Sequence, residues 1–257
     1  MAPARNRRAR RDPVDPSHAP QMRTHHRGPL LGIDCVIPAA GLSSRLPEGK
    51  LTREFRGSPL IVHAVGNALA ACERAIVVVG HSGEEVRIAL APLCGKEPRR
   101  VVFVENPHYR RGMITSIAQG SMAVRTDRFF VAPGDMPFLR PALYRKIAAA
   151  DTNGPGPPLA GDDDGARAER PVGWFPTYRG DPGHPTLIRA IVRDALQAYV
   201  RGAIKEECGP TELPSMRRFL AKYPTDTVDV QHEGATIDID TPEQFERYGR
   251  TGNGDPR

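Results

Sequence analysis

Short apolar segments alternate with segments of helical periodicity from residue 32 onward, and this alternation constrains the fold more than any other feature. Residues 75–79 and 128–132 have the length of a strand and are apolar almost throughout. Strands that are apolar on both faces are typical of parallel sheets with helices on both sides. We therefore expect an α/β fold in which a mostly parallel sheet is covered by helices on both faces.

The periodicity places the expected elements along the chain. Strands are expected at residues 32–38, 75–79, 100–105, 128–132 and 171–175, with a further strand pair at 227–230 and 236–239. Helices are expected at residues 59–72, 84–93, 112–124, 141–150, 187–200 and 211–222, and a last helix begins at Thr241. Proline, glycine and aspartate dominate residues 152–170, which are expected to be a flexible surface excursion. One domain, residues 31–250, accounts for all these elements.

The basic charge of the chain is concentrated in its first residues. The formal net charge is +6, and residues 1–27 hold seven arginines and two aspartates. A Pro- and Arg-rich segment with few large apolar residues cannot bury a core, so residues 1–30 are predicted to be a disordered tail. Residues 251–257 are expected to be a disordered C-terminus. The remaining body is nearly neutral, and a nucleic-acid partner is therefore not expected.

The cysteines and the apolar runs indicate the compartment. The four cysteines show no Cys-x-x-Cys pairing, and two of them, Cys35 and Cys72, lie in apolar runs. Such cysteines behave as small buried hydrophobic residues, which is typical of a reducing compartment. No apolar run approaches the length of a membrane span. We predict a soluble cytoplasmic protein with no membrane partner.

Residues 36–50 form the first candidate site. A strand leads into the small residues Ala39, Ala40 and Gly41, and the loop then offers two serines, Arg45 and Lys50. Such a loop can wrap backbone N–H groups and cations around phosphates. The glycine spacing excludes a Walker A motif, and no Gly-x-Gly-x-x-Gly follows a strand, which disfavours a Rossmann dinucleotide site.

Carboxylates in two later segments complete a possible metal–phosphate site. Asp135 directly follows a buried strand, where open α/β sheets bind ligands, although an aspartate in such a turn often bonds only its own backbone. Asp238 and Asp240 lie near the end of the chain, and either Asp240 or Thr241 can cap the last helix. Because Mg²⁺ takes one or two carboxylates with phosphates and waters, these residues predict a Mg²⁺–triphosphate site.

Two further segments offer polar groups. Gly112 would open a helix whose first turn presents Thr115 and Ser116, an arrangement that ordinary helix capping also explains. His184 stands in the turn Gly183-His184-Pro185, where a packed or surface histidine is the more common alternative to a functional one.

Together these segments resemble the MobA-like nucleotidyltransferases, in family order over about residues 32–249. The matching stretches are Ala39-Ala40-Gly41-Leu42-Ser43-Ser44-Arg45 through Lys50, Asn106-Pro107-x-Tyr109 with Gly112-x-x-Thr115-Ser116, Gly134-Asp135-Met136-Pro137, Gly183-His184-Pro185, and Ile237-Asp238-Ile239-Asp240-Thr241-Pro242-Glu243. The resemblance implies a single Rossmann-like nucleotidyltransferase domain. The Ala-Ala-Gly opening favours a pyrimidine nucleotide over a guanine nucleotide.

The resemblance also implies roles for individual residues. The nucleotide-binding set would be Ala39, Ala40, Gly41, Leu42, Ser43, Ser44, Arg45, Lys50 and Gly80. Arg45, Lys50 and Asp135 would be catalytic, with Arg45 at the β- and γ-phosphates and Lys50 at the α-phosphate. Asp135 and Asp240 (or, as the weaker alternative, Asp238) would bind Mg²⁺. Thr115, Ser116 and His184 would line the acceptor side.

The implied reaction is the transfer of CMP from CTP to the terminal phosphate of molybdopterin, with release of pyrophosphate. A molybdenum hydroxylase would be the client that receives the product. The open alternatives are guanylyl transfer from GTP to the same acceptor, nucleotidyl transfer to a sugar or polyol phosphate, and a non-enzymatic cofactor chaperone. The chain departs from the family at Leu46-Pro47-Glu48-Gly49, where members commonly have Met-Gly after the arginine.

Overall fold

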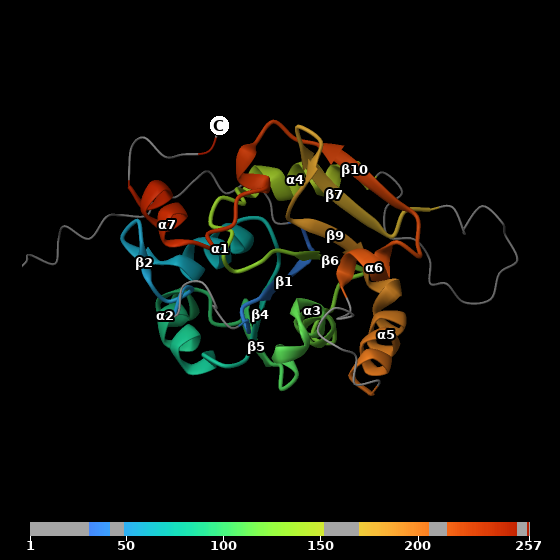
Figure 1. Ribbon diagram of the computed structural model, residues 1–257, viewed down its shortest axis with the longest axis horizontal. Coiled ribbons are helices and arrows are strands. Elements are labelled where there is room, and N and C mark those ends of the chain that lie inside the picture. The colour runs from blue at the N-terminus through green and yellow to red at the C-terminus, as the bar shows by residue number, and fades with distance from the viewer. Residues whose placement is uncertain (1–30, 42–48, 152–169, 206–214, 251–255, 257) are drawn as a thin grey trace, which may run out of the picture.

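The computed structural model describes residues 31–41, 49–151, 170–205, 215–250 and 256, and these build one α/β domain (Figure 1). Within them, eight strands form a mixed sheet in the order β10-β7-β9-β6-β1-β4-β5, with β8 paired to β7. The parallel half contains β1 (Asp34–Pro38), β4 (Ala75–Val79), β5 (Val101–Glu105) and β6 (Arg128–Val131). The other half contains β7 (Gly173–Tyr178), β8 (Asp181–Pro182), β9 (Thr186–Arg189) and β10 (Thr225–Asp229).

Helices cover both faces of the sheet, which confirms the predicted architecture. Successive side chains of a strand point to opposite faces, so Cys35 and Ile37 enter one core and Val36 enters the other. The first core is closed by α1 (Leu60–Leu69), α2 (Gly83–Lys96) and α4 (Pro141–Ala150). The second is closed by α3 (Met113–Ser121), α5 (Arg193–Lys205) and α6 (Met216–Leu220).

A third, smaller core holds the last helix against a hairpin that the sequence reading missed. The hairpin pairs β2 (Glu54–Phe55) with β3 (Ser58–Pro59), and α7 (Pro242–Gly249) packs beside it (Figure 1). The buried side chains of this core include Phe55, Phe138, Ile239 and Phe245. This packing brings α7 to the segment that follows Lys50.

Two predicted elements are wrong. Residues 187–200 are not one helix, because Thr186–Arg189 is strand β9, antiparallel to both β6 and β7, and a 3₁₀ turn (Ala190–Val192) separates it from α5. Leu187 and Ile188 are both buried but enter opposite cores, as a strand requires. Short apolar runs do not distinguish a strand from a helix.

The second error is the strand predicted at residues 236–239. These residues form no strand, and β10 pairs in parallel with β7 instead. The alternation of Ile237 and Ile239 has another cause, since both side chains are buried in the third core. Two short 3₁₀ turns complete the described chain, at Tyr109–Arg111 and Glu233–Ala235.

Several predictions concern residues outside the described ranges. These are the disorder predicted for 1–30 and for 251–257 apart from residue 256, most of the excursion 152–170, and the start of the helix expected at 211–222, of which α6 is the described part. No helix in the described part of the chain is long and apolar enough to span a membrane.

Candidate active site

The ammonium group of Lys50 lies between two carboxylates, Asp135 and Asp240, which come from distant segments of the chain. Lys50 Nζ donates to Asp135 Oδ2 at 2.7 Å and to Asp240 Oδ1 at 2.6 Å. The Lys50 side chain is 11% exposed, that of Asp135 22% and that of Asp240 33%. The cluster is therefore sheltered on the lysine side and open to solvent on the carboxylate side.

Asp135 is positioned by the turn that follows β6. Gly134 N–H donates to the Pro38 carbonyl at 3.1 Å, and Met136 N–H donates to the Pro133 carbonyl at 3.2 Å. A Cβ atom on Gly134 would lie only 2.6 Å from Ile61 Cδ1, so the turn packs closely against α1 at this glycine. These contacts place Asp135 at the carboxyl ends of β1 and β6, the edge where open α/β sheets bind ligands.

Lys50 is positioned by a tight turn that leads into the hairpin. Gly49 has φ +62°, and its carbonyl accepts hydrogen bonds from Thr52 N–H (2.8 Å) and Arg53 N–H (3.1 Å). The next residue, Leu51, accepts a hydrogen bond from the backbone N–H of Ile61 in α1 at 2.9 Å. The backbone on both sides of Lys50 is thus tied down, and the side chain extends toward the carboxylates.

Asp240 is positioned by the start of α7. Thr241 is the N-cap: its hydroxyl accepts from Gln244 N–H, and Gln244 Oε1 accepts from the backbone N–H groups of Asp240 (2.8 Å) and Thr241 (3.0 Å). Ile239 N–H donates to the Asp135 carbonyl at 3.0 Å. The sequence left the capping residue open, and the structure assigns the cap to Thr241, so the Asp240 carboxylate points to Lys50.

Lys50 is protonated in this cluster. Burial, the largest single effect, lowers its pKa, but the charges and hydrogen bonds of Asp135 and Asp240 together outweigh burial and leave the pKa raised above its ordinary value. A lysine with a raised pKa is a permanent cation near neutral pH. Its available role is therefore electrostatic, and it cannot serve as a base.

Asp238 stands beside this cluster rather than in it. Partial burial, followed by the negative charges of Asp240 and Asp135, raises its pKa. The carboxyl of Asp238 thus interacts with the cluster through charge.

The carboxylates of Asp135 and Asp240 suit a metal ion with oxygen ligands. Both reach the same cation, so their negative charge converges on one point. Mg²⁺ commonly takes one or two carboxylates, with substrate phosphates and waters as its other ligands. In the part of the chain that the structure describes, no three His, Cys, Asp or Glu side chains gather around one point. The pair fits the predicted ion only if substrate and water supply the other ligands.

His184 lies near the same carboxylate on the antiparallel side of the sheet. Its Nδ1 is 3.3 Å from the Val131 carbonyl, and its backbone N–H donates to the Ala235 carbonyl at 2.8 Å. Burial lowers the pKa of His184, and the hydrogen bond to the Val131 carbonyl and the charge of Asp135 offset only part of that effect. The ring is therefore neutral near pH 7.

Thr115 and Ser116 belong to a buried network at the start of α3. Asn106 Nδ2 donates to Thr115 Oγ1 (2.9 Å) and Ser116 Oγ (3.0 Å), and the Thr115 hydroxyl lies 2.8 Å from the Gly112 carbonyl. Both residues are only 3% exposed. The network joins the end of β5 to α3, so these hydroxyls hold the local backbone together. Their acceptor-binding role stays a prediction.

The described part of the phosphate loop reaches the same edge of the sheet. Ala39 and Ala40 are buried, Gly41 is exposed, and Ala39 N–H donates to the Val78 carbonyl at 2.8 Å. A Cβ on Gly80 would lie 2.9 Å from Ala40 Cβ, so the glycine permits this close approach. The other predicted loop residues, Leu42, Ser43, Ser44 and Arg45, lie outside the described residues.

A cavity of about 470 Å³ beside Gly80 was not predicted. Its lining includes His81, Glu84, Arg87, Asn106 and Tyr109. The rings of His81 and Tyr109 stack with centroids 6.2 Å apart. The sequence feature that could have indicated it is Gly80-His81-Ser82-Gly83 at the end of an apolar strand. This segment places the His81 ring near the phosphate loop.

Comparison with known proteins identifies the family of the chain. The family model described as MobA-like NTP transferase domain matches residues 35–223. The molybdenum cofactor cytidylyltransferase of Escherichia coli K12 is 30% identical over 224 residues, which cover 85% of this chain and 98% of that protein.

Solved structures share the fold at lower identity. A nucleotidyl transferase from Methanothermobacter thermautotroptrophicus has a TM-score of 0.61 and 22% identity, covering 85% of this chain and 96% of that one. Rv0371C from Mycobacterium tuberculosis H37Rv, solved as a complex with manganese, has a TM-score of 0.53 and 20% identity, covering 86% of this chain and 100% of that one.

Proposed function

The chain belongs to the MobA-like NTP transferase family, and from this premise we propose that it transfers CMP from CTP to the terminal phosphate of molybdopterin, releasing pyrophosphate. Nucleotidyl transfer follows from the family, and the choice of nucleotide and acceptor is the proposal. Its support is the nearly full-length match to a relative named for the cytidylyl reaction and the Ala-Ala-Gly opening of the phosphate loop.

One observation carries the mechanism: a protonated lysine bound by two carboxylates at the ligand-binding edge of the sheet. Phosphoryl-group transfer concentrates negative charge on the oxygens of the reacting phosphate, and fixed cations there stabilise the transition state. Lys50 would turn from Asp135 and Asp240 to the α-phosphate when the nucleotide binds. Arg45, outside the described residues, would contact the β- and γ-phosphates that leave.

Asp135 and Asp240 would hold Mg²⁺, which when bound supplies positive charge to the triphosphate. The protein contributes the positions of these carboxylates. Asp135 is fixed by its turn against β1, and Asp240 is fixed by the capping box of α7. The Ile239–Asp135 backbone hydrogen bond also joins the two segments that carry these carboxylates.

The acceptor needs no general base. The terminal phosphate of molybdopterin is largely a dianion near pH 7, because the second pKa of a phosphate monoester is about 6. Catalysis then consists of aligning this oxygen for in-line attack and of stabilising charge. Thr115, Ser116 and His184 are proposed to shape the acceptor side, where His184 is neutral and repels no cation or anion.

The decisive experiment measures pyrophosphate release from each of the four NTPs with Mg²⁺, with and without molybdopterin. The proposal expects rapid release only with CTP and molybdopterin together. Release from GTP with molybdopterin would establish guanylyl transfer. Release that requires a sugar or polyol phosphate would show that this compound, and not molybdopterin, is the acceptor. Either result would overturn the proposed substrates while leaving nucleotidyl transfer intact.

A non-enzymatic chaperone that delivers the cofactor to a molybdenum hydroxylase is tested with Asp135→Ala. We expect this variant to lose pyrophosphate release, whereas Asp229→Ala, which removes an exposed carboxylate on β10, should behave like the wild type. A chaperone would deliver the cofactor equally well with Ala at position 135.

A further inference from the structure

The ammonium group of Lys50 lies where the two candidate metal ligands meet. Lys50 Nζ is 2.7 Å from Asp135 Oδ2 and 2.6 Å from Asp240 Oδ1. Carboxylate oxygens are also the ligands that Mg²⁺ takes from a protein. A metal ion bound by these oxygens would therefore compete with Lys50 for them, and its charge would repel the ammonium group.

Asp135 is the carboxylate that depends on Lys50. In the described part of the chain, its side chain forms one hydrogen bond, which it accepts from Lys50 Nζ. Its backbone carbonyl is engaged separately, by Ile239 N–H at 3.0 Å. Asp240, by contrast, has a further interaction besides the one with Lys50. A cation that binds Asp135 Oδ2 must consequently displace Lys50, and one that binds Oδ1 must lie next to the positive charge of Lys50.

The shelter of the ion pair makes this competition strong. The Lys50 side chain is 11% exposed, and its backbone is fixed by the Gly49 turn and by the hydrogen bond between Ile61 N–H and the Leu51 carbonyl. Salt screens a sheltered ion pair much less than an exposed one. Rotation of the flexible four-carbon stem can move the ammonium group, but a sheltered cation is stable only beside another anion.

A nucleotide supplies that anion. We propose that Lys50 is an internal competitor of the metal ion: it holds the Asp135 carboxylate in the nucleotide-free protein and releases it when a nucleotide phosphate binds the ammonium group. This competition rests on the phosphate-binding role of Lys50 in the proposed function. The free protein then binds the metal ion weakly. Nucleotide and metal ion strengthen each other's binding, by the same factor in each direction.

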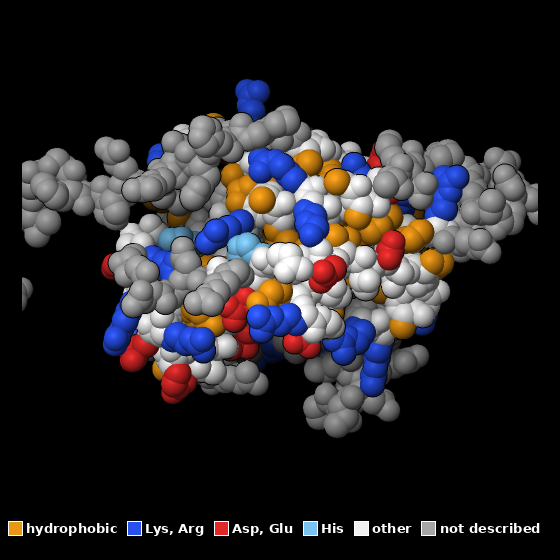
Figure 2. All heavy atoms as spheres, turned by 90° about the horizontal axis from the view of Figure 1, so that it is seen from above, with side chains coloured by type: hydrophobic (Ala, Val, Ile, Leu, Met, Phe, Trp, Pro, Cys, Tyr) orange, Lys and Arg blue, Asp and Glu red, His pale blue; other side chains and the backbone are white. Residues whose placement is uncertain are grey.

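The effect of Lys50 has to be separated from general positive charge. Figure 2 shows Lys and Arg side chains spread across one whole face of the molecule, so the loss of any cation could raise the affinity for a metal ion. The matched control is Arg53→Met, in the turn that follows Lys50. Arg53 is exposed, and its guanidinium lies 4.6 Å from the centroid of the Phe245 ring. This variant removes the same charge and leaves the Lys50–Asp135 ion pair in place.

The test is calorimetric titration of the full-length, nucleotide-free protein with MnCl₂ at constant ionic strength, because Mn²⁺ suits the same oxygen ligands as Mg²⁺. Lys50→Met should bind Mn²⁺ about 10-fold more tightly than the wild type or better, since the Asp135 carboxylate loses its fixed cation. Lys50→Arg keeps the charge and should bind as weakly as the wild type. Adding Asp135→Asn to Lys50→Met should abolish the gain.

Three results would overturn the proposal. The first is a Mn²⁺ affinity in Lys50→Met that equals or falls below that of the wild type. The second is an equal gain in Lys50→Met and Arg53→Met, which would reduce the effect to general charge. The third is a gain that persists when Asp135→Asn is added. If Lys50→Met does not fold, Lys50→Gln, whose amide can still donate to a carboxylate, takes its place with the same expected gain.

The titration contains neither nucleotide nor acceptor, so its outcome is independent of the proposed substrates. A gain in Lys50→Met would stand even if pyrophosphate release showed GTP or a sugar phosphate to be the substrate. An unchanged affinity would overturn the competition even if CTP and molybdopterin were confirmed.

Discussion

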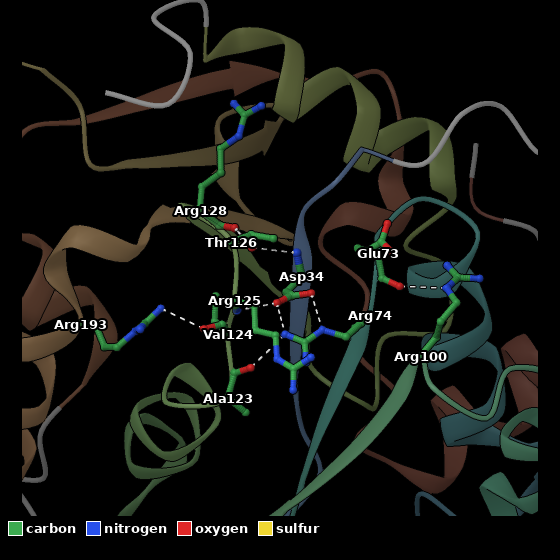
Figure 3. Close-up of polar contacts among 10 residues, drawn as sticks. All are labelled: Asp34, Glu73, Arg74, Arg100, Ala123, Val124, Arg125, Thr126, Arg128 and Arg193. Carbon is green, nitrogen blue, oxygen red and sulfur yellow. Dashed lines mark hydrogen bonds and ion pairs between the residues drawn. The ribbon is translucent and has the colours of Figure 1, made fainter. Parts of the chain in front are cut away.

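Two clusters pair carboxylates with cations at opposite ends of the parallel strands, and they differ in how completely the protein encloses them. At the amino end of β1, the fully buried Asp34 accepts hydrogen bonds from Arg74 Nε (3.0 Å), Arg74 Nη2 (2.5 Å) and Arg125 N–H (2.8 Å) (Figure 3). At the carboxyl end, Lys50 joins Asp135 and Asp240, whose side chains both reach solvent.

The difference in enclosure determines whether a cluster can contact a ligand. Protein donors surround Asp34 on both oxygens, and Arg74 also donates to the Ala123 carbonyl at 3.0 Å, so the cluster ties β1 and β4 to the end of α3 (Figure 3). Such an enclosed pair has no room for a ligand, and its loss would leave a buried charge. The open cluster leaves its carboxylates partly exposed at the carboxyl ends of the strands, where the proposed substrate would compete with the protein's own ion pairs.

The largest expected effect comes from breaking the enclosed cluster. Arg74→Met should lower the free energy of unfolding by about 3–5 kcal/mol, because it leaves the Asp34 carboxylate buried without its main partner. Denaturant titration measures the change. Arg87→Met, which breaks an ion pair to Glu105 that is far more exposed, should cost under about 1 kcal/mol. Equal losses in the two variants would remove the distinction between enclosed and open clusters.

Breaking the open cluster should affect catalysis instead of stability. Lys50→Met is expected to reduce kcat/KM for pyrophosphate release by about 10²–10³-fold, the loss typical of one group that stabilises transition-state charge. Its free energy of unfolding should change less than in Arg74→Met. A variant that is strongly destabilised yet keeps wild-type kcat/KM would show that Lys50 is a structural residue.

A smaller effect should separate the two carboxylates near the end of the chain. Asp240→Asn should raise the Mg²⁺ concentration needed for half-maximal activity by about 10–100-fold, the range seen when a metal site is disturbed. Asp238→Asn, outside the cluster, should raise it much less. If Asp238→Asn has the larger effect, the assignment of the metal to Asp240 is wrong.

The smallest effect concerns the neutral histidine at the open end. Because the pKa of His184 is lowered in the folded state, the unfolded chain binds more protons as the pH falls. The stability contribution is therefore full above about pH 6.5 and is lost as the pH falls through the folded pKa, by at most about 1.4 kcal/mol per pH unit.

His184→Gln should make the unfolding free energy less dependent on pH between about pH 7 and pH 5. His108→Gln, which changes an exposed side chain after β5, serves as the control and should keep the wild-type dependence. Equal pH dependence in wild type and His184→Gln would mean that His184 titrates alike in the folded and unfolded chains.

The parallel half of the fold could be predicted because its strands are continuous apolar runs in the sequence. Residues 75–79 are buried on both faces of the sheet, and a run of five apolar residues predicts this burial. The antiparallel half could not, since β9 is a short apolar run whose state depends on the strands beside it. The isoleucines at 237 and 239 alternate like a strand only because the third core takes both side chains.

The candidate site divides in the same way. Asp135 and Lys50 could be predicted as site residues, because Asp135 directly follows an apolar strand and Lys50 ends a loop of small and cationic residues. The direct contact of Lys50 with both carboxylates had no sequence signal.

By itself the sequence determined the α/β class, the family motifs in order and the residue types that can handle phosphate, because strand burial, turn glycines and local charge are recorded in neighbouring residues. Only the tertiary structure decided which charges meet. Contacts such as Lys50 with Asp240, 190 positions apart, depend on how sheet, hairpin and last helix pack together. Local sequence does not encode that packing, because it depends on the geometry of all three cores at once.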